Sequence, residues 1–197
     1  MLIYDNPWSG NCYKVRLLCS QLGLPLERRE LSVVDRSDRP GVLGGLNPAL
    51  RVPTVVFDDG RVLAESGAII SYLAEGTPYL PEDRFERAQV LQWMFFEQYD
   101  LEPNIAVARF WKLAGIEPGA ERVAEKLTLG NKVLAAIDSH LRERTFIVGE
   151  RYTIADICIY AYTHVADQGG FELSRYGAIG PWLARVTSQP DHIPIDA

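Results

Sequence analysis

The first third of the chain alternates short apolar segments with a segment of helical periodicity. Residues 2–4 are predicted to form a short buried strand and residues 26–31 a second strand. Between them, apolar residues recur at helical spacing from Cys12 to Leu22, and Gly23 is suited to end that helix. The order strand, helix, strand predicts a parallel pair joined by a right-handed crossover.

A β-hairpin and a further helix are predicted next. Residues 54–57 and 61–64 are two short strands, and the Asp58-Asp59-Gly60 sequence between them is typical of a tight antiparallel turn. Only a short, irregular helix is expected within 36–46, because Pro40 and three glycines would weaken any longer one. Ser66 is expected to be the N-cap of a helix that reaches about Glu75.

The start of the hairpin carries a proline with a distinct local consequence. Pro53 has no backbone N–H, so it belongs at the beginning of a strand. We expect it to leave the amide and carbonyl of Val52 outside the sheet, and we expect the Val52-Pro53 peptide bond to be cis.

Beyond residue 76 the strand pattern stops. Residues 76–81 contain two prolines and are predicted to be a linker, and a long helical pattern then begins near Asp83. Pro103 is expected to kink that helix. A second long apolar pattern at helical spacing covers 123–141.

Two further helices are predicted near the end of the chain. Thr153 and Asp156 have the spacing of a capping box, and the apolar run that follows them predicts a central, buried helix. Pro181 is expected to start the last helix and Pro190 to end it. The chain is therefore predicted to be an α/β domain followed by an all-α domain.

Composition narrows the possible functions. Hydrophobic residues make up 47% of the 197-residue chain and charged residues 23%, as in ordinary globular proteins. The net charge of −6 argues against a nucleic-acid partner. No apolar run is long enough to span a membrane and no signal pattern opens the chain, so we expect no membrane association and a cytoplasmic location.

The cysteines and histidines suggest neither disulfides nor a metal. The three cysteines form no Cys-x-x-Cys pair, and their odd number is unlike a disulfide framework. The three histidines lie in separate segments without a ligand pattern, so we expect no metal site.

The order Val52-Pro53-Thr54, hairpin, Glu65-Ser66, helix resembles the glutathione-binding half of the cytosolic glutathione transferases. The resemblance covers essentially the whole chain. It implies a thioredoxin-like glutathione-binding domain at 1–77 and an all-helical domain at 83–197 that contributes the acceptor pocket. It also implies a homodimer, with glutathione as co-substrate and detoxification as the setting.

The resemblance assigns glutathione contacts residue by residue. The backbone of Val52 beside Pro53 would hold the cysteinyl part, and Arg51 would lie near the glycyl carboxylate. Glu65 and Ser66 would take the γ-glutamyl end, since a carboxylate pairs with an ammonium group and a helix start receives a carboxylate. Without Val52-Pro53 ahead of it, Glu65-Ser66 would be an ordinary helix start.

Activation of the glutathione thiol requires a hydrogen-bond donor directed at sulfur. The Pro7-Trp8-Ser9 entry to the first helix resembles that of the serine-type transferases, which makes Ser9 the first candidate donor. Asn11 is a second, neutral donor near the same helix start. The alternative is that Ser9 or Asn11 only caps the helix.

Three other mechanisms are open to this family. Tyr4 is the rival donor, although its strand pattern favours a packed residue. Cys12 could form a mixed disulfide with glutathione, as in a cysteine-using bacterial branch, but we favour a packing role. The zeta-type isomerase entry, Ser-Ser-Cys-Ser, does not match Ser9-Gly10-Asn11-Cys12.

The acceptor pocket is less clearly marked in the sequence. Aromatic and cationic residues of the first loop and the long helix are candidates, although aromatic residues at helical spacing more often belong to a core. These candidates are Trp8, Tyr99, Arg109 and Trp111.

The resulting hypothesis is a transferase that conjugates the glutathione thiolate to small electrophiles. A glutathione-dependent disulfide or peroxide reductase on the same fold is the nearest alternative. A non-catalytic, transferase-like binding module is the third, and a module without catalysis would have no need of Ser9, Val52-Pro53 and Glu65-Ser66.

Overall fold

The computed structural model describes all 197 residues, which divide into two compact units. The first unit consists of Met1–Glu75 and Pro190–Ala197, and the second of Gly76–Gln189. The last eight residues differ from the sequence-based prediction, which placed them with the helical domain. The physical reason is that side chains of the first unit, including Arg16 and Arg28, donate hydrogen bonds to backbone carbonyls of this segment.

The first unit is built on a four-stranded sheet in the order β2-β1-β3-β4. Strand β1 (Leu2–Asp5) pairs in parallel with β2 (Glu27–Glu30) and antiparallel with β3 (Thr54–Val56). Strand β4 (Val62–Ala64) completes the hairpin with β3. The parallel crossover and the antiparallel hairpin are both confirmed.

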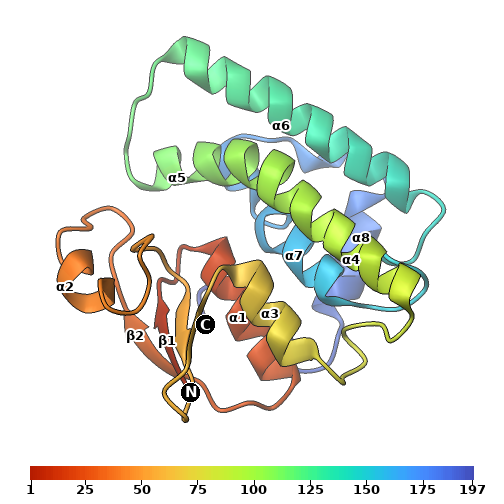
Figure 1. Cartoon of the computed structure of the whole chain (residues 1–197). Helices are drawn as coiled ribbons and strands as arrows, with labels where there is room; N and C mark the ends of the chain where they lie inside the picture. Colours follow the sequence, from red (N-terminus) through yellow and green to blue (C-terminus); the bar gives the residue numbers. More distant parts are fainter. The chain divides into compact units, whose positions relative to one another are not determined.

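Three helices belong to this sheet (Figure 1). Helix α1 (Gly10–Gln21) crosses between β1 and β2, and α3 (Ser66–Ala74) follows β4 and packs beside α1. Helix α2 (Arg39–Leu43) is the short helix expected within 36–46. Many apolar side chains of the sheet and the two longer helices are fully buried, including those of Ile3, Leu17, Val55 and Ile69.

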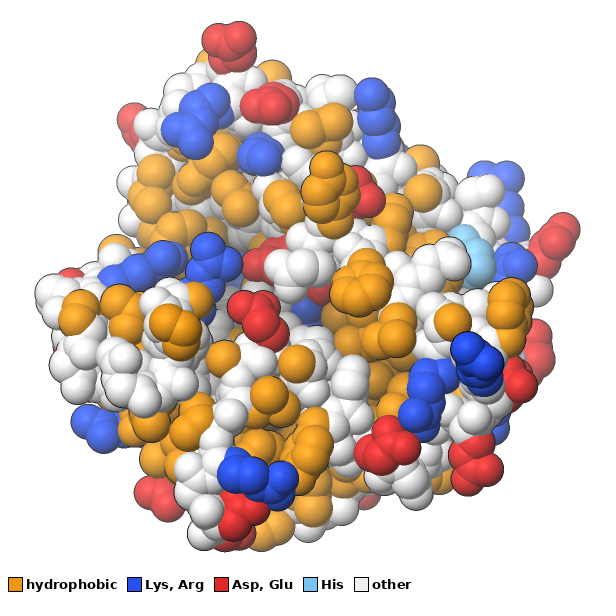
Figure 2. Space-filling model, viewed as in Figure 1, with side chains coloured by type: hydrophobic (Ala, Val, Ile, Leu, Met, Phe, Trp, Pro, Cys, Tyr) orange, Lys and Arg blue, Asp and Glu red, His pale blue; other side chains and the backbone are white.

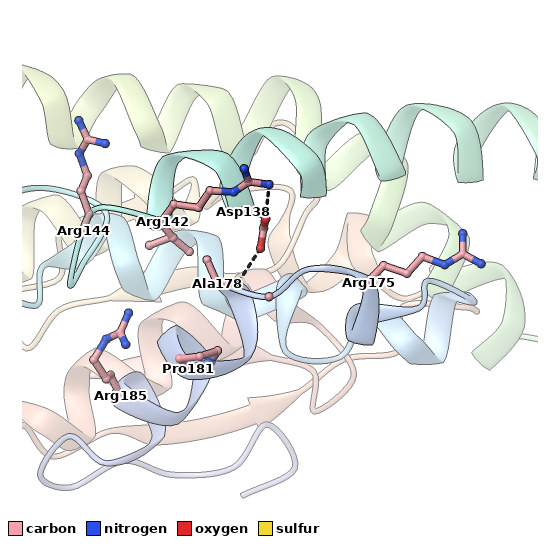
Figure 3. Close-up of a pocket in the computed structure, with 9 residues that line it drawn as sticks. Asp138, Arg142, Arg144, Arg175, Ala178, Pro181 and Arg185 are labelled. Atoms are coloured by element: carbon pink, nitrogen blue, oxygen red, sulfur yellow. Dashed lines mark hydrogen bonds and ion pairs between the residues drawn. The ribbon is translucent and has the colours of Figure 1, made fainter.

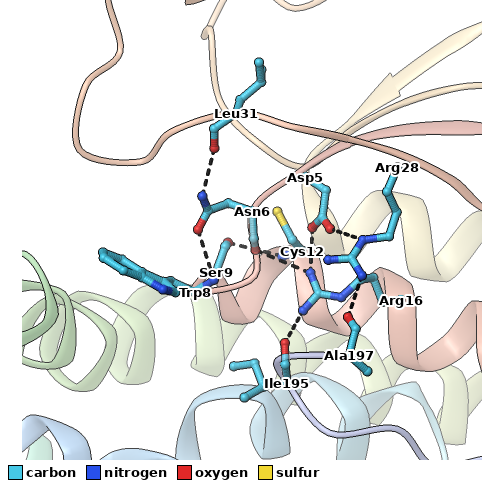
Figure 4. A network of polar contacts seen from close by, with 10 residues as sticks. All are labelled: Asp5, Asn6, Trp8, Ser9, Cys12, Arg16, Arg28, Leu31, Ile195 and Ala197. Carbon is cyan, nitrogen blue, oxygen red and sulfur yellow. Dashed lines mark hydrogen bonds and ion pairs between the residues drawn. The ribbon is translucent and has the colours of Figure 1, made fainter.

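A buried charge network holds the end of the chain to the first unit (Figure 4). The Asp5 carboxylate is 1% exposed and accepts from Arg16 Nη1 and from Arg28 Nε, each at 2.6 Å. The same two guanidinium groups donate to the backbone oxygens of Ile195 and Ala197. Because a buried charge needs charged or polar partners, this network joins β1, α1, β2 and the C-terminal segment.

The second unit is helical. The chain passes through α4 (Arg84–Phe96), a π-helix (Glu97–Ala106) and α5 (Val107–Leu113), and returns through the 22-residue helix α6 (Ala120–Leu141). Helices α7 (Ile154–Thr163) and α8 (Ile179–Thr187) follow, with short 3-10 helices at Ala166–Gly169 and Leu173–Arg175 between them. No helix in the chain combines the length and apolar character required to cross a membrane.

Pro103 lies inside the π-helix. The wider turns accommodate a residue that has no N–H to donate and whose ring would crowd a regular α-helical turn. Asn104 Nδ2 donates to the carbonyl of Asp100 at 2.7 Å, so a side chain supplies a bond to the backbone in this region. At the proline that was expected to kink the long helix, the chain thus forms ten residues of π-helix in place of α-helix.

Helix α7 lies at the centre of the second unit, where every one of its residues is buried. The predicted capping box is confirmed: the Asp156 carboxylate accepts from the Thr153 backbone N–H at 3.0 Å, and the Thr153 hydroxyl accepts from the first turn. Asp156 also accepts from Ile147 N at 2.8 Å and from Trp182 Nε1 at 3.0 Å. One carboxylate therefore ties α7 to the preceding loop and to α8.

Candidate active site

The loop between β1 and α1 presents Ser9, and Asn6 sets its shape. Asn6 Nδ2 donates to the Leu31 carbonyl at 2.8 Å, and Asn6 Oδ1 accepts from Trp8 N at 3.0 Å. The Asn6 carbonyl accepts from Ser9 N at 3.1 Å (Figure 4). Asn6 is itself buried, so the loop is fixed from the interior. The sequence analysis did not identify this role of Asn6.

Ser9 is the N-cap of α1. Its hydroxyl oxygen accepts from Cys12 N at 3.2 Å, and its backbone is extended, as is usual at this position. Ser9 therefore does cap the helix, as the alternative interpretation expected. A hydroxyl also carries one proton to donate, and the capping bond uses only a lone pair of the oxygen. Capping and donation to a ligand are compatible.

The two rival activating residues, Cys12 and Tyr4, are both buried. Cys12 is fully buried. Burial raises the pKa of its thiol to about 12, so Cys12 is protonated at neutral pH and acts as a packing residue. Tyr4 is 7% exposed and packs in a cluster with Leu31 and Leu43. The preference for packing roles at both positions agrees with this burial.

The N-terminal turns of α1 and α3 meet through three polar side chains. Asn11 Oδ1 accepts from Lys14 Nζ at 2.8 Å and from Ser66 Oγ at 3.2 Å, while Lys14 Nζ lies 3.5 Å from Ser66 Oγ. We call Asn11, Lys14 and Ser66 the α1–α3 cluster. Two residues predicted separately for activation and for binding are thus in direct contact.

Ser66 is not the N-cap of α3, contrary to the prediction. The helix begins at Ser66 itself, and Glu65 occupies the cap position without a side-chain capping bond. Because Ser66 is already the first residue of the helix, its side chain does not occupy the cap position, and its hydroxyl is instead turned toward Asn11, to which it donates.

Lys14 is the residue of this cluster that sequence reasoning missed. Its side chain is fully buried, which is unusual for lysine. A cationic group beside two helix N-termini, each with a partial positive charge, favours an anionic ligand at this place. Its spacing of three residues from Asn11 on one helix was the available signal, but its contact with α3 depends on the fold.

Glu65 has a strained backbone. Its φ of +68° lies in a region that non-glycine residues adopt at a cost of about 1–3 kcal/mol. Such strain persists where the surrounding structure imposes it, and it is concentrated at ligand sites. The Glu65 side chain is exposed directly before the α3 start, so it is placed to meet a ligand there.

The loop before β3 leaves the Val52 backbone unpaired. The Val52-Pro53 bond is cis, as predicted, and Val52 takes part in no backbone hydrogen bond of the sheet or its loops. The buried Asn47 side chain fixes this loop: Nδ2 donates to the Arg51 carbonyl at 3.1 Å and to Thr54 Oγ1 at 3.0 Å. The Arg51 side chain is exposed.

The loop has a second internal support. Arg39, which is 3% exposed, donates from Nη1 to the Leu50 carbonyl and from Nη2 to the Ser32 carbonyl. Asn47 and Arg39 therefore hold the Val52 segment from within, and neither was recognised from the sequence.

The candidate acceptor residues have different environments. The Trp8 side chain is 43% exposed, and Tyr99, in the π-helix, is 82% exposed. Trp111 is half-buried under the guanidinium of Arg122, at 5.3 Å from the ring centroid. Arg109 is 5% exposed, its Nε donates to Gln168 Oε1 at 2.8 Å, and burial lowers the pKa of its guanidinium.

No group of three or more His, Cys, Asp or Glu side chains is arranged to hold a metal ion. All three cysteines are free and buried.

Comparison with known proteins bears on the whole chain. Residues 8–75 match the model of the glutathione S-transferase N-terminal domain, and residues 89–190 match that of the C-terminal domain. A crystal structure of a glutathione S-transferase from Pseudomonas fluorescens Pf-5 is 43% identical, with a TM-score of 0.95 and coverage of 98% of each chain. The first unit is thus thioredoxin-like, with the helical unit following as in that structure.

Two curated relatives have different names. The disulfide-bond oxidoreductase YfcG of Escherichia coli K12 is 28% identical over 152 residues, which cover 74% of this chain and 71% of the relative. Elongation factor 1-gamma of Artemia salina is 30% identical over 171 residues, which cover 84% of this chain but only 40% of the relative. Since both domain models match, in order and over most of the residues, the chain belongs to the glutathione S-transferase family.

Proposed function

We propose that this protein is a glutathione transferase that joins the thiolate of bound glutathione to small electrophilic molecules. The observation that carries the proposal is the α1–α3 cluster, in which Asn11, Lys14 and Ser66 bring two helix starts together one turn from the Ser9 hydroxyl. Two helix N-termini with a buried lysine form a setting for a peptide carboxylate. A hydroxyl at the same helix start is suited to a thiolate.

The proposed contacts divide glutathione into its three parts. Ser66 and the α3 amides receive the γ-glutamyl carboxylate, and Glu65 pairs with the neighbouring ammonium group. The backbone amide and carbonyl of Val52 hold the cysteinyl part, because they have no other backbone partner. Arg51, with its exposed side chain, pairs with the glycyl carboxylate.

The reaction needs the sulfur as a thiolate. We propose that the Ser9 hydroxyl donates a hydrogen bond to it, with the Asn11 amide as the secondary donor. Each pKa unit by which the thiol is lowered corresponds to about 1.4 kcal/mol of preference for the thiolate. The sulfur then forms a bond to the electrophilic carbon. The displaced electron pair leaves with a halide, or moves to the epoxide oxygen or the isothiocyanate nitrogen, which is then protonated.

We propose fewer acceptor contacts than the four candidate residues from the sequence. Trp8 and Tyr99 have exposed rings, and Trp111 has a partly exposed one. Arg109 was also a candidate, but its side chain is held inside the helical unit by Gln168. We therefore propose Trp8, Tyr99 and Trp111 as acceptor contacts and a structural role for Arg109.

Two alternatives each have one supporting observation. The similarity to a disulfide-bond oxidoreductase favours a glutathione-dependent reductase, for which an activated thiolate is equally useful. The similarity to elongation factor 1-gamma, whose name denotes no transferase activity, favours a binding module without catalysis. Free, buried cysteines suit a reducing compartment, and we propose a cytoplasmic location.

Glutathione binding and turnover test the proposal together. We expect retention on immobilised glutathione, and conjugation of at least one electrophile in a panel of chlorinated aromatic, epoxide and isothiocyanate compounds. Turnover of disulfides or hydroperoxides alone would favour the reductase. Retention without turnover of any of these would favour the binding module.

A matched pair of serine variants locates the binding. Ser66→Ala is expected to weaken glutathione binding about tenfold, because it removes one hydrogen bond to a charged group. Ser71→Ala is the control, since Ser71 Oγ lies on the same helix but donates to the Gly67 carbonyl. Equal losses in the two variants would contradict the placement of glutathione at the α3 start.

We also propose that the protein is a homodimer. Helix α4 exposes large apolar side chains, with Phe85 72% and Phe95 69% exposed, and Leu91 39% exposed. Figure 2 shows that apolar side chains reach the surface of the molecule. On α3, Tyr72 is 47% exposed. Several large apolar side chains exposed on one helix are typical of a surface that a second subunit covers.

Sedimentation tests this proposal. We expect the parent protein to sediment at twice its 22.1 kDa chain mass. The double variant Phe85→Ser, Phe95→Ser is expected to sediment as a monomer, while Leu129→Ser, which changes a 37% exposed leucine of α6, is expected to stay dimeric. A monomeric parent at micromolar concentration would refute the proposal.

A further inference from the structure

The helical unit contains an open cavity of about 490 Å³ between the end of α6 and the start of α8. Four arginines line it and one acidic residue, Asp138, accompanies them; the remaining lining residues carry no charge (Figure 3). The arginines are Arg142, Arg144, Arg175 and Arg185. This concentration of positive charge stands out in a chain whose net charge is −6.

The Asp138 carboxylate offsets only one of the four positive charges, that of Arg142, and both of its oxygens are engaged. Oδ1 accepts from Ala178 N, at the start of α8, at 2.7 Å. Oδ2 lies 3.5 Å from Arg142 Nη2. Figure 3 marks both contacts of Asp138 with dashed lines. Asp138 is 5% exposed. Asp138 holds the start of α8 to α6, so its side chain has a structural role in the wall of the cavity.

Two of the arginines have no acidic partner. Arg144 Nη1 donates to the His140 carbonyl at 3.1 Å, and Arg185 Nε donates to the Thr145 carbonyl at 2.9 Å. A backbone carbonyl orients a guanidinium group but does not cancel its charge. Arg175, in contrast, is paired with Glu172 through Nε at 2.6 Å. Arg144 and Arg185 therefore keep N–H donors and a full positive charge for a ligand.

The chemistry of the lining selects the class of ligand. A guanidinium group presents paired N–H donors that match phosphate oxygens, and several such groups favour an anion of more than one charge. The lining contains no aromatic side chain on which a base could stack, and the overall negative charge disfavours a polymeric nucleic acid. The volume suits a small molecule.

From these contacts we propose that the cavity between α6 and α8 binds a small phosphate-bearing polyanion, through Arg144 and Arg185 with Arg142 at its side. The site lies wholly in the helical unit, and its residues take no part in the proposed glutathione contacts. The proposal therefore stands independently of the proposed function. Ligand binding would link the end of α6 to the start of α8, the two elements that Asp138 already joins.

Calorimetric titration with inorganic pyrophosphate, at constant ionic strength, tests the proposal. We expect saturable one-site binding with a dissociation constant below 1 mM, a working figure for a pair of charge-assisted contacts. Sulfate is expected to bind at least tenfold more weakly, because it offers a single tetrahedral group. Citrate is a polyanion without phosphate, so it distinguishes a preference for phosphate from attraction to charge alone. If citrate bound as tightly as pyrophosphate, the phosphate assignment would be overturned.

Three arginine variants locate the binding. Arg144→Gln and Arg185→Gln are each expected to weaken pyrophosphate binding about tenfold, the loss typical of one charge-assisted hydrogen bond. Arg122→Gln, on α6 outside the cavity, removes the same charge and is expected to change binding less than twofold. Equal weakening in all three would show a general charge effect and overturn the site.

The folded state of the variants is checked by their melting temperatures. Arg144 is exposed and bonded only to a backbone carbonyl, so Arg144→Gln alone decides the question if Arg185→Gln unfolds. Parent protein that binds pyrophosphate no better than sulfate, or an Arg144→Gln variant that binds as the parent does, would refute the proposal.

Discussion

Replacement of Asp156 by alanine is expected to lower the free energy of unfolding by about 4 kcal/mol, the largest stability loss that we expect from a single side chain here. The carboxylate accepts from Ile147 N, Thr153 N and Trp182 Nε1, all within the interior. Alanine would leave these three donors buried without a partner, at about 1–3 kcal/mol each before relaxation. Chemical denaturation of the variant and the parent measures the difference.

Asp83 provides the matched control. It also caps a helix, since its carboxylate accepts from Phe85 N and Glu86 N, each at 2.9 Å, but it is exposed to solvent. Water can replace these bonds, so Asp83→Ala is expected to cost about 1 kcal/mol. Equal losses at the two positions would show that the capping bond alone, and not burial of the donors, determines the effect.

The same carboxylate is expected to make stability depend on pH. Burial raises the pKa of Asp156 from an ordinary 3.8 to about 6, against the opposing effect of its hydrogen bonds to Ile147, Trp182 and Thr153. Between about pH 4 and 6 the folded state then holds a proton that the unfolded state has lost. The contribution of this group to the free energy of unfolding therefore falls as the pH rises through that interval, and it is constant above it.

Comparison with Asp156→Asn isolates this contribution, because asparagine does not titrate. We expect the difference in unfolding free energy between parent and variant to change between pH 4 and 6, with the parent losing relative stability as the pH rises. A difference that stays constant across this interval would place the folded-state pKa of Asp156 at its ordinary value.

Ser9→Ala is expected to lower the rate of conjugation by about tenfold to a thousandfold while it leaves glutathione affinity nearly unchanged. The hydroxyl is the proposed donor to sulfur, whereas the proposed contacts to the rest of the tripeptide lie elsewhere. Loss of the donor should raise the pKa of the bound thiol. The pH dependence of thiolate absorbance in the complex measures that pKa directly.

The capping role of Ser9 requires a control, because alanine also removes the bond from Cys12 N to Ser9 Oγ. Ser9→Thr keeps a hydroxyl that both caps and donates, so it is expected to restore the thiol pKa and much of the rate. Tyr4→Phe is expected to leave both nearly unchanged, since Tyr4 packs against Leu31 and Leu43. A thiol pKa that responds to Tyr4→Phe and not to Ser9→Ala would reverse the donor assignment.

Asn11→Ala is expected to behave differently from Ser9→Ala. Asn11 Oδ1 accepts from Lys14 and Ser66, so its removal disturbs the α1–α3 cluster as well as the secondary donor. The rate loss is expected to be smaller than for Ser9→Ala and to be accompanied by weaker glutathione binding.

Local sequence patterns determined much of the fold. The Asp58-Asp59-Gly60 turn, the cis proline at Pro53 and the capping box at Thr153 and Asp156 each depend on neighbouring residues, and the structure has all three. The resemblance carried by Val52-Pro53 and Glu65-Ser66 also pointed to the correct family. These features are readable because backbone dihedral preferences and helix caps act over only a few residues.

Features that depend on contacts between distant residues could not be predicted from local sequence patterns. The sequence indicated Ser66 as a helix cap, but only the packing of α3 against α1 turned its hydroxyl to Asn11, 55 residues away. Likewise, the C-terminal segment joins the first unit through Arg16 and Arg28, whose guanidinium groups also hold the buried Asp5. A side chain's hydrogen-bonding capacity is set by its own chemistry, whereas its partners are set by which elements the fold places within about 3 Å.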